Sequence, residues 1–245
     1  MTRPVRLGIL TPSSNTVLEP LTTALAAEMP EVTLHFSRFR VTEIALDPGA
    51  LQQFDDAPVI QAAALLADAK VDAIVWSGTS SSWLGFGRDV ALCRAIQAAT
   101  GVPATSSILA LNEALRQLGV RRLALVTPYT ADVQARITAT YAGIGIQCTA
   151  ERHLGLRDNF SFAAVTEPEL DGLIRFVAQG RPDAAAIVCT NLRAAPLVAG
   201  LEAALGVPVL DSVATALWGA LRLAGADPGR ITRWGGLFQL GGAQG

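Results

Sequence analysis

The chain has 245 residues, of which 51 % are hydrophobic and 16 % are charged, a composition typical of a globular protein with a large buried core. Its 19 basic and 21 acidic residues leave a net charge of −2. Without a basic excess to contact phosphates, we expect no nucleic-acid partner. The segment Met1–Val5 is polar, and no apolar run approaches the length of a membrane span. We therefore expect a cytoplasmic protein with no membrane partner.

The sequence offers little for metal or cofactor chemistry. Lys70 is the only lysine, and no glycine-rich loop for a phosphate or a dinucleotide follows a strand. His35 and His153 lie far apart without the spacing of a metal site, and no G-x-S-x-G elbow is present. The three cysteines are too scattered for a disulfide framework. We expect neither a metal nor a cofactor.

Short apolar runs alternate along the chain with segments of helical apolar periodicity. The predicted strands, in chain order, are Val5–Leu10, Thr33–Phe39, Ala73–Trp76, Leu123–Val126, Ala185–Val188 and Val207–Leu210. The predicted helices are Val59–Ala69, Arg88–Ala99, Ser107–Leu118, Val133–Tyr141, Glu167–Ala178 and Ser212–Ala224. This alternation predicts an α/β fold with parallel sheets covered by helices on both faces.

Three blocks of the sequence occur twice in the same order. The pairs are Leu7–Pro12 with Leu123–Pro128, Val71–Ser80 with Pro182–Asn191, and Gly101–Pro103 with Gly206–Pro208. A repeat of this size indicates two copies of one α/β unit. We expect an N-terminal half of residues 1–112, completed by the segment 212–245, and a second half of residues 113–211.

Ligands of parallel sheets bind outside the carboxyl ends of the strands. We therefore expect the functional residues among those that directly follow each predicted strand. Pro12, Ser13, Ser14 and Asn15 follow the first strand. They could simply cap the next helix. Alternatively, the backbone N–H groups of this turn and the amide of Asn15 bind a carboxylate.

The two copies of the second repeated block end differently. Gly78, Thr79 and Ser80 begin a run of hydroxyl side chains that could cap a helix or stabilise an oxyanion. Cys189 occupies the position that corresponds to Gly78, and Thr190 and Asn191 follow it. A thiol at a strand end can act as an acid or a base, which makes Cys189 the strongest candidate for catalysis.

Two other features are weaker. Tyr129 follows the second Thr-Pro pair and could donate a hydrogen bond to a substrate oxygen, although packing is the more common role of such a tyrosine. Cys93, in a predicted helix, and Cys148, in a predicted edge segment, are interpreted as small apolar residues. His35 and Arg38 are expected at the surface.

The twofold repeat, the Pro12–Asn15 turn and the thiol at position 189 together resemble the aspartate/glutamate racemase superfamily. Within it the chain is most similar to the branch of maleate isomerase and arylmalonate decarboxylase. The resemblance implies two pseudo-symmetric Rossmann-like domains with parallel sheets and an active site in the cleft between them. It also implies a cofactor-independent enzyme. The racemases carry one cysteine in each half, whereas the first-half position here is Gly78.

The resemblance to arylmalonate decarboxylase includes Gly78, Thr79, Ser80, Tyr129 and the lone thiol of Cys189. It implies decarboxylation of a small, malonate-like dicarboxylic acid. Thr79, Ser80, Tyr129 and backbone N–H groups would stabilise the enediolate, and Cys189 would protonate one face of it.

Two alternatives stay open at this point. In an isomerase of the maleate type, Asn15 and Asn191 would bind the two carboxylates while Cys189 acts alone. In a non-catalytic protein that binds carboxylates, the missing first cysteine would reflect a lost activity. The low charge and the apolar composition also make a homo-oligomer plausible.

Overall fold

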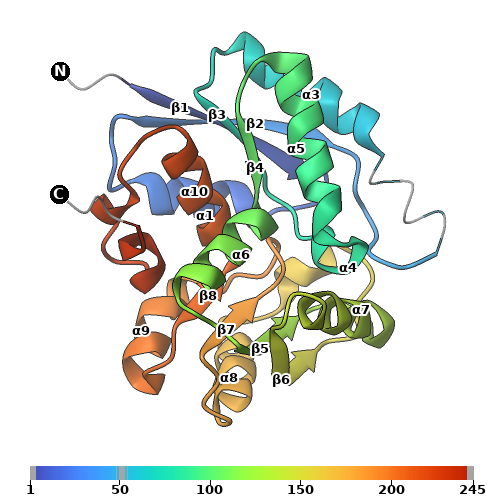
Figure 1. The fold of residues 1–245 in the computed structure, drawn as a ribbon, viewed down its shortest axis with the longest axis vertical. Coiled ribbons are helices and arrows are strands. Elements are labelled where there is room, and N and C mark those ends of the chain that lie inside the picture. Colours follow the sequence, from blue (N-terminus) through green and yellow to red (C-terminus); the bar gives the residue numbers. More distant parts are fainter. Residues whose placement is uncertain (1–3, 48, 50–52, 54, 242–245) are drawn as a thin grey trace.

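Two parallel four-stranded sheets form the core of the computed structural model, which describes residues 4–47, 49, 53 and 55–241 (Figure 1). The first sheet has the order β2-β1-β3-β4, and the second has the order β6-β5-β7-β8. The strands of the first sheet are β1 (Val5–Pro12), β2 (Val32–Phe39), β3 (Ala73–Trp76) and β4 (Ala104–Ser106). Those of the second are β5 (Arg122–Thr127), β6 (Gln147–His153), β7 (Ala184–Ile187) and β8 (Val209–Asp211). The matching strand orders confirm the α/β fold with parallel sheets.

Helices connect the strands in both halves. The first half contains α1 (Leu18–Ala26), α3 (Asp56–Asp68), α4 (Ser81–Leu84), α5 (Phe86–Thr100) and α6 (Ser107–Gln117). After β5 come α7 (Ala131–Ala142), α8 (Glu167–Ala178), α9 (Ala195–Leu205) and α10 (Ser212–Leu223). Short 3-10 turns lie at Ser161–Ala164, Pro228–Arg230 and Gly236–Gln239. No helix among the described residues is long and apolar enough to cross a membrane.

Each predicted strand and helix corresponds to an observed element. The structure contains further strands and helices whose sequences were too short or too irregular to predict them. Strand β4 has only three residues, Ala-Thr-Ser, and α4 is a single turn. Helices α1 and α9 both contain a proline near their start, which interrupts the apolar pattern. The strand predicted at Val207–Leu210 begins at Val209 instead, because Pro208 has no N–H group for the ladder.

The last helix, α10, packs against elements of the first half. It contacts α6, β3, β4 and α1, and Figure 1 shows it beside α1. The division of the chain into residues 1–112 with 212–245, and 113–211, stays a prediction.

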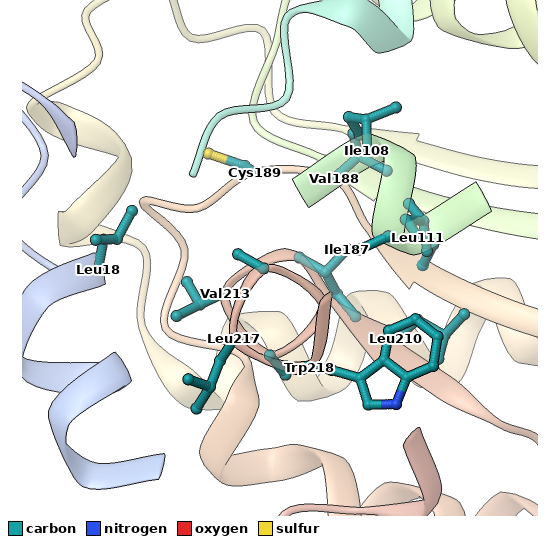
Figure 2. Close-up of a cluster of buried hydrophobic side chains, with 14 of the residues drawn as sticks. Leu18, Ile108, Leu111, Ile187, Val188, Cys189, Leu210, Val213, Leu217 and Trp218 are labelled. Carbon is teal, nitrogen blue, oxygen red and sulfur yellow. The ribbon is translucent and has the colours of Figure 1, made fainter. Parts of the chain in front are cut away.

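A buried apolar cluster surrounds α10 where the halves meet (Figure 2). Its side chains come from α1, α6, β7, β8 and α10, and include Leu18, Ile108, Leu111, Ile187, Leu210, Val213, Leu217 and Trp218. Hydrogen bonds also join α6 of the first repeat to α10 of the second. Ser107 Oγ donates to the carbonyl of Ser212 at 2.6 Å, and Thr215 Oγ1 donates to the carbonyl of Ser107 at 3.2 Å. The two halves therefore share one continuous core.

Asp211 links the second sheet to α10 through its buried carboxyl group. Its Oδ1 accepts hydrogen bonds from the backbone N–H groups of Val213 and Ala214, at 2.8 and 2.9 Å. Its Oδ2 has no hydrogen-bond partner in the described structure. Burial raises the pKa of Asp211 to about 7, although the two N–H groups favour the charged form. The carboxyl is therefore a helix cap that holds its proton more firmly in the folded state than in the unfolded chain.

We expect Leu217→Ala to lower the free energy of unfolding by about 2–5 kcal/mol, because it leaves a cavity in the shared core. Leu223→Ala, at the end of the same helix where the side chain is 39 % exposed, should lower it by less than about 1 kcal/mol. Urea unfolding of both variants tests this prediction. Equal losses would contradict the position of α10 in the core.

Asp211→Asn should reduce the pH dependence of stability while keeping the helix cap. A carboxyl whose pKa is raised on folding stabilises the folded state at low pH and loses this contribution as the pH rises toward 7. Between pH 5 and 8 the wild type should lose about 2 kcal/mol more than the variant. Urea unfolding at both pH values measures the difference, and parallel losses would disprove it.

Candidate active site

A narrow pocket lies at the carboxyl ends of β1, β3, β5 and β7, between the two halves. It encloses about 290 Å³ of empty space, its open mouth included. Its lining residues are Pro12, Val41, Ile44, Trp76, Gly78, Thr79, Ser80, Trp83, Tyr129, Asn159, Cys189 and Thr190. Seven of the eleven residues singled out from the sequence therefore line one pocket, with contributions from both repeats.

Cys189 follows β7. Among the described residues that line this pocket, it is the only cysteine. Its side chain is 2 % exposed, and Figure 2 shows it at the margin of the apolar cluster. The sulfur accepts a hydrogen bond from the backbone N–H of Asn191 at 3.3 Å. Burial raises the pKa of the thiol to about 12, even though this N–H group and the hydroxyl of Tyr129 favour the thiolate. The group is therefore a neutral thiol that holds a proton.

Tyr129 and Thr79 bring a hydroxyl pair from opposite halves next to this thiol. The Tyr129 hydroxyl lies 2.7 Å from Thr79 Oγ1 and within hydrogen-bond reach of the Cys189 sulfur. Its ring packs edge-on against Trp83 and Phe162, with centroid distances of 5.1 and 5.7 Å. Burial raises the pKa of the phenol well above its ordinary value. Tyr129 therefore remains a hydrogen-bond donor at every physiological pH.

The turn after β3 is held by its own backbone. The carbonyl of Thr79 accepts from the backbone N–H of Ser82 at 3.0 Å and from Ser82 Oγ at 2.7 Å. The carbonyl of Ser80 accepts from the N–H groups of Trp83 and Leu84 at 3.1 and 2.9 Å. These bonds fix the backbone of Thr79 and Ser80, and both residues line the pocket.

In the turn after β1, Pro12 lines the pocket whereas Ser13, Ser14 and Asn15 are not among the lining residues. Ser14 Oγ donates to the carbonyl of Val41 at 2.6 Å, and Ser13 Oγ exchanges longer bonds with the same residue. Asn15 Oδ1 accepts from the N–H groups that begin α1, at 3.0 and 2.9 Å. These contacts are those of a capping turn. A role of these residues in binding a carboxylate stays a prediction.

Thr190 and Asn191 join the halves. Thr190 Oγ1 accepts from Asn15 Nδ2 and donates to the carbonyl of Ser77, both at 3.2 Å. Asn191 Oδ1 accepts from the N–H groups of Thr16 and Val17, and its Nδ2 donates to the carbonyl of Asn159 at 2.5 Å. Thr190 lines the pocket while Asn191 does not. Binding of substrate by either residue stays a prediction.

Most of the apolar wall of the pocket, and two polar residues that support it, were not predicted from the sequence. Val41, Ile44, Trp76 and Trp83 line the pocket, and they carry no recognisable motif. Asn159 also lines it and donates from Nδ2 to Ser14 Oγ at 2.8 Å. It lies in an irregular segment after β6, where sequence patterns give no signal.

Arg38 is exposed on β2, as expected, but its side chain also holds the turn after β1 in place. Its Nη1 donates to the carbonyls of Ser13 and Asn15 at 2.9 and 3.1 Å, and its Nε pairs with Glu19 at 2.9 Å. Arg38 therefore fixes the turn after β1 from outside. In the part of the chain that the structure describes, no three His, Cys, Asp or Glu side chains gather where they could hold a metal ion.

The chain is similar to proteins of known function. The family model described as arylmalonate decarboxylase matches residues 16–238. Arylmalonate decarboxylase of Bordetella bronchiseptica is 36 % identical over 164 residues, which cover 66 % of this chain and 68 % of that protein.

Solved structures of two activities share the fold. One is a cysteine-to-serine variant of maleate cis-trans isomerase from Nocardia farcinica with a covalently bound succinylcysteine intermediate. It has a TM-score of 0.88 and 25 % identity, covering 96 % of this chain and 98 % of that one. The other is a liganded variant of arylmalonate decarboxylase in which a glycine and a cysteine are replaced by cysteine and serine. It has a TM-score of 0.83 and 28 % identity, with the same coverage.

These findings confirm the predicted resemblance and the prediction of an enzyme from the decarboxylase and isomerase branch. The family model covers most of the described chain, including β3, β7 and every lining residue except Pro12. The chain belongs to the arylmalonate decarboxylase family.

Proposed function

We propose that this enzyme decarboxylates a small malonate-like dicarboxylic acid without a cofactor, and that Cys189 protonates the resulting enediolate. The observation that carries the proposal is the neutral Cys189 thiol beside the hydroxyl pair of Tyr129 and Thr79 in one pocket. Such a group can give a proton to a carbanion, and the hydroxyls can stabilise negative charge on oxygen.

The proposed reaction begins with cleavage of the bond between the α-carbon and one carboxylate. The electron pair of this bond passes to the α-carbon and the remaining carboxylate, which become an enediolate, and carbon dioxide leaves. Thr79, Ser80 and Tyr129 donate hydrogen bonds to the enediolate oxygens. The thiol of Cys189 then transfers its proton to the α-carbon, and the resulting thiolate takes a proton from water.

The apolar side of the pocket favours the first step. Val41, Ile44, Trp76 and Trp83 line the site with side chains that are mostly apolar. A carboxylate placed against them loses hydration, and its departure as neutral carbon dioxide removes the charge from this environment. The polar side, with Thr79, Ser80 and Asn159, is suited to the carboxylate that stays.

A maleate-type isomerisation is the second candidate, supported by the similarity to maleate isomerase over nearly the whole chain. In that reaction Cys189 would act as a nucleophile and would need to lose its proton. Burial opposes this step, since it raises the thiol pKa to about 12. Burial of the thiol therefore favours the decarboxylase. A homo-oligomer and a cytoplasmic location stay predictions from composition.

We expect Cys189→Ala to reduce decarboxylation of phenylmalonate by a factor of about 10²–10⁴, because the general acid is removed. Cys93→Ala, at a buried cysteine of α5 that does not line the pocket, should keep wild-type activity. Proton NMR in heavy water measures deuterated phenylacetate from each protein. Wild-type turnover by Cys189→Ala would refute the proton donor, and conversion of maleate to fumarate would instead establish the isomerase.

The pH profile offers an independent prediction. Because burial holds the pKa of Cys189 near 12, the thiol remains protonated when the pH rises past the range in which an exposed cysteine ionises. The value of kcat/KM should therefore not fall between pH 7 and 9.5. A stopped assay for phenylacetate across this range tests the statement. A decline centred near pH 8.5 would show an exposed, ordinary thiol.

A further inference from the structure

Asp89 is a buried carboxyl group of the first half that the proposed reaction does not use. It lies in the first turn of α5 and is fully buried. Its Oδ2 accepts a hydrogen bond from Ser106 Oγ, at the end of β4. The same hydroxyl caps α6 by accepting from the backbone N–H of Leu109 at 3.0 Å. The carboxyl therefore ties α5 to the junction of β4 and α6.

The hydroxyl group of Ser81 lies close to the same carboxyl. Ser81 is the first residue of α4 and is fully buried. Burial raises the pKa of Asp89 to about 6, while the hydroxyls of Ser106 and Ser81 favour its charged form. In the described structure, Ser81 Oγ and Asp89 Oδ1 have no hydrogen bond of ordinary geometry to any group. Since buried polar groups are costly when unsatisfied, this donor and this acceptor are suited to each other.

Ser81 directly follows the turn whose residues line the pocket. Helix α4 is a single turn, too short to be stable without contacts to its surroundings. It packs against α5 and against α7 of the second half (Figure 1). Thr79, Ser80 and Trp83 line the pocket, and the ring of Trp83 packs on Tyr129. A displacement of α4 would therefore move polar and aromatic parts of the site together.

The corresponding turn of the second half is fixed in a different way. If the alignment of the repeats is continued without a gap, Ser81 corresponds to Leu192, which is apolar and fully buried. The turn there is held by hydrogen bonds of Thr190 and Asn191 to the first half. The fold itself therefore does not require a buried acid behind this turn. The pairing of Asp89 with Ser81 belongs to the half whose turn contributes hydroxyl groups to the proposed reaction.

We propose that Asp89 is a positioning residue: its carboxyl, held by Ser106, accepts a hydrogen bond from Ser81 and fixes the turn of Thr79 and Ser80 before the substrate binds. This inference rests on the proposed function, in which the residues of this turn donate hydrogen bonds to the enediolate. Groups that are already in place stabilise the charge of a transition state without reorganisation. Loosening the turn should therefore lower kcat more than it raises KM.

Hydrogen exchange tests the positioning without requiring activity. The backbone N–H groups at positions 82–85 all donate hydrogen bonds within this turn. Asp89→Leu should raise their exchange rates by about tenfold or more. Ser81→Ala should do the same, and it leaves the bond between Asp89 and Ser106 intact. Asp89→Asn should exchange like the wild type, because the amide can accept from Ser106 and donate to Ser81.

Thr22→Val is the matched control, because it removes another buried hydroxyl group. Thr22 Oγ1 donates to the carbonyl of Leu18 in α1 at 2.7 Å, and Thr22 is not among the described residues that line the pocket. This variant should leave exchange at positions 82–85 unchanged. Wild-type exchange in both Asp89→Leu and Ser81→Ala would overturn the positioning role. An equal increase in Thr22→Val would also overturn it, since the effect would then be a general loss of stability.

Turnover of phenylmalonate tests the consequence for the reaction. Asp89→Leu and Ser81→Ala should lower kcat by about tenfold or more and change KM by less than about threefold. Asp89→Asn and Thr22→Val should keep the wild-type kcat. An unchanged kcat in the first two variants would overturn the role of Asp89 in the reaction. If the wild type does not decarboxylate phenylmalonate, the proposed function fails, and the exchange rates still decide whether Asp89 fixes the turn.

Discussion

Desolvation of the Cys189 thiol is the constraint on which the chemistry depends. The sulfur lies at the margin of the shared core, where removal from water disfavours a thiolate and raises the pKa to about 12. A neutral thiol can donate a proton and is a poor nucleophile. The same burial favours loss of a charged carboxylate as carbon dioxide. In the proposed reaction, one physical effect thus keeps a proton on Cys189 and assists the cleavage of the carbon–carbon bond.

The position of the thiol depends in turn on how the halves are joined. Thr190 and Asn191, directly after Cys189, bond to Asn15, Ser77 and the start of α1 in the first half. Helix α10 packs against the first sheet, and Asp211 caps it from the end of β8. The polar residues next to the thiol therefore fix the geometry of the cleft. This gives them a structural function whether or not they also contact the substrate.

The sequence predicted the fold class because two copies of one α/β pattern reinforce each other, and the relatives confirmed the family. It also singled out Cys189, Thr79 and Tyr129, which follow strands and converge in one pocket. It could not predict the apolar wall, because Trp76 and Ile44 have the appearance of ordinary core residues until the fold places them. The fold also brings the Trp76 indole to the place where a Cβ at position 78 would lie, which the sequence does not show. Short or proline-containing elements such as β4 and α1 carry too little pattern to be found.

The central claim is that a single thiol delivers the proton to one face of the intermediate. The most direct test is the configuration of the 2-deuterophenylacetate formed from phenylmalonate in heavy water, determined by NMR of a chiral derivative. We expect one enantiomer, because Cys189 is the proton donor in the proposed reaction and the corresponding position in the first repeat, Gly78, has no thiol. An equal mixture of enantiomers, formed by an active wild-type enzyme, would contradict it.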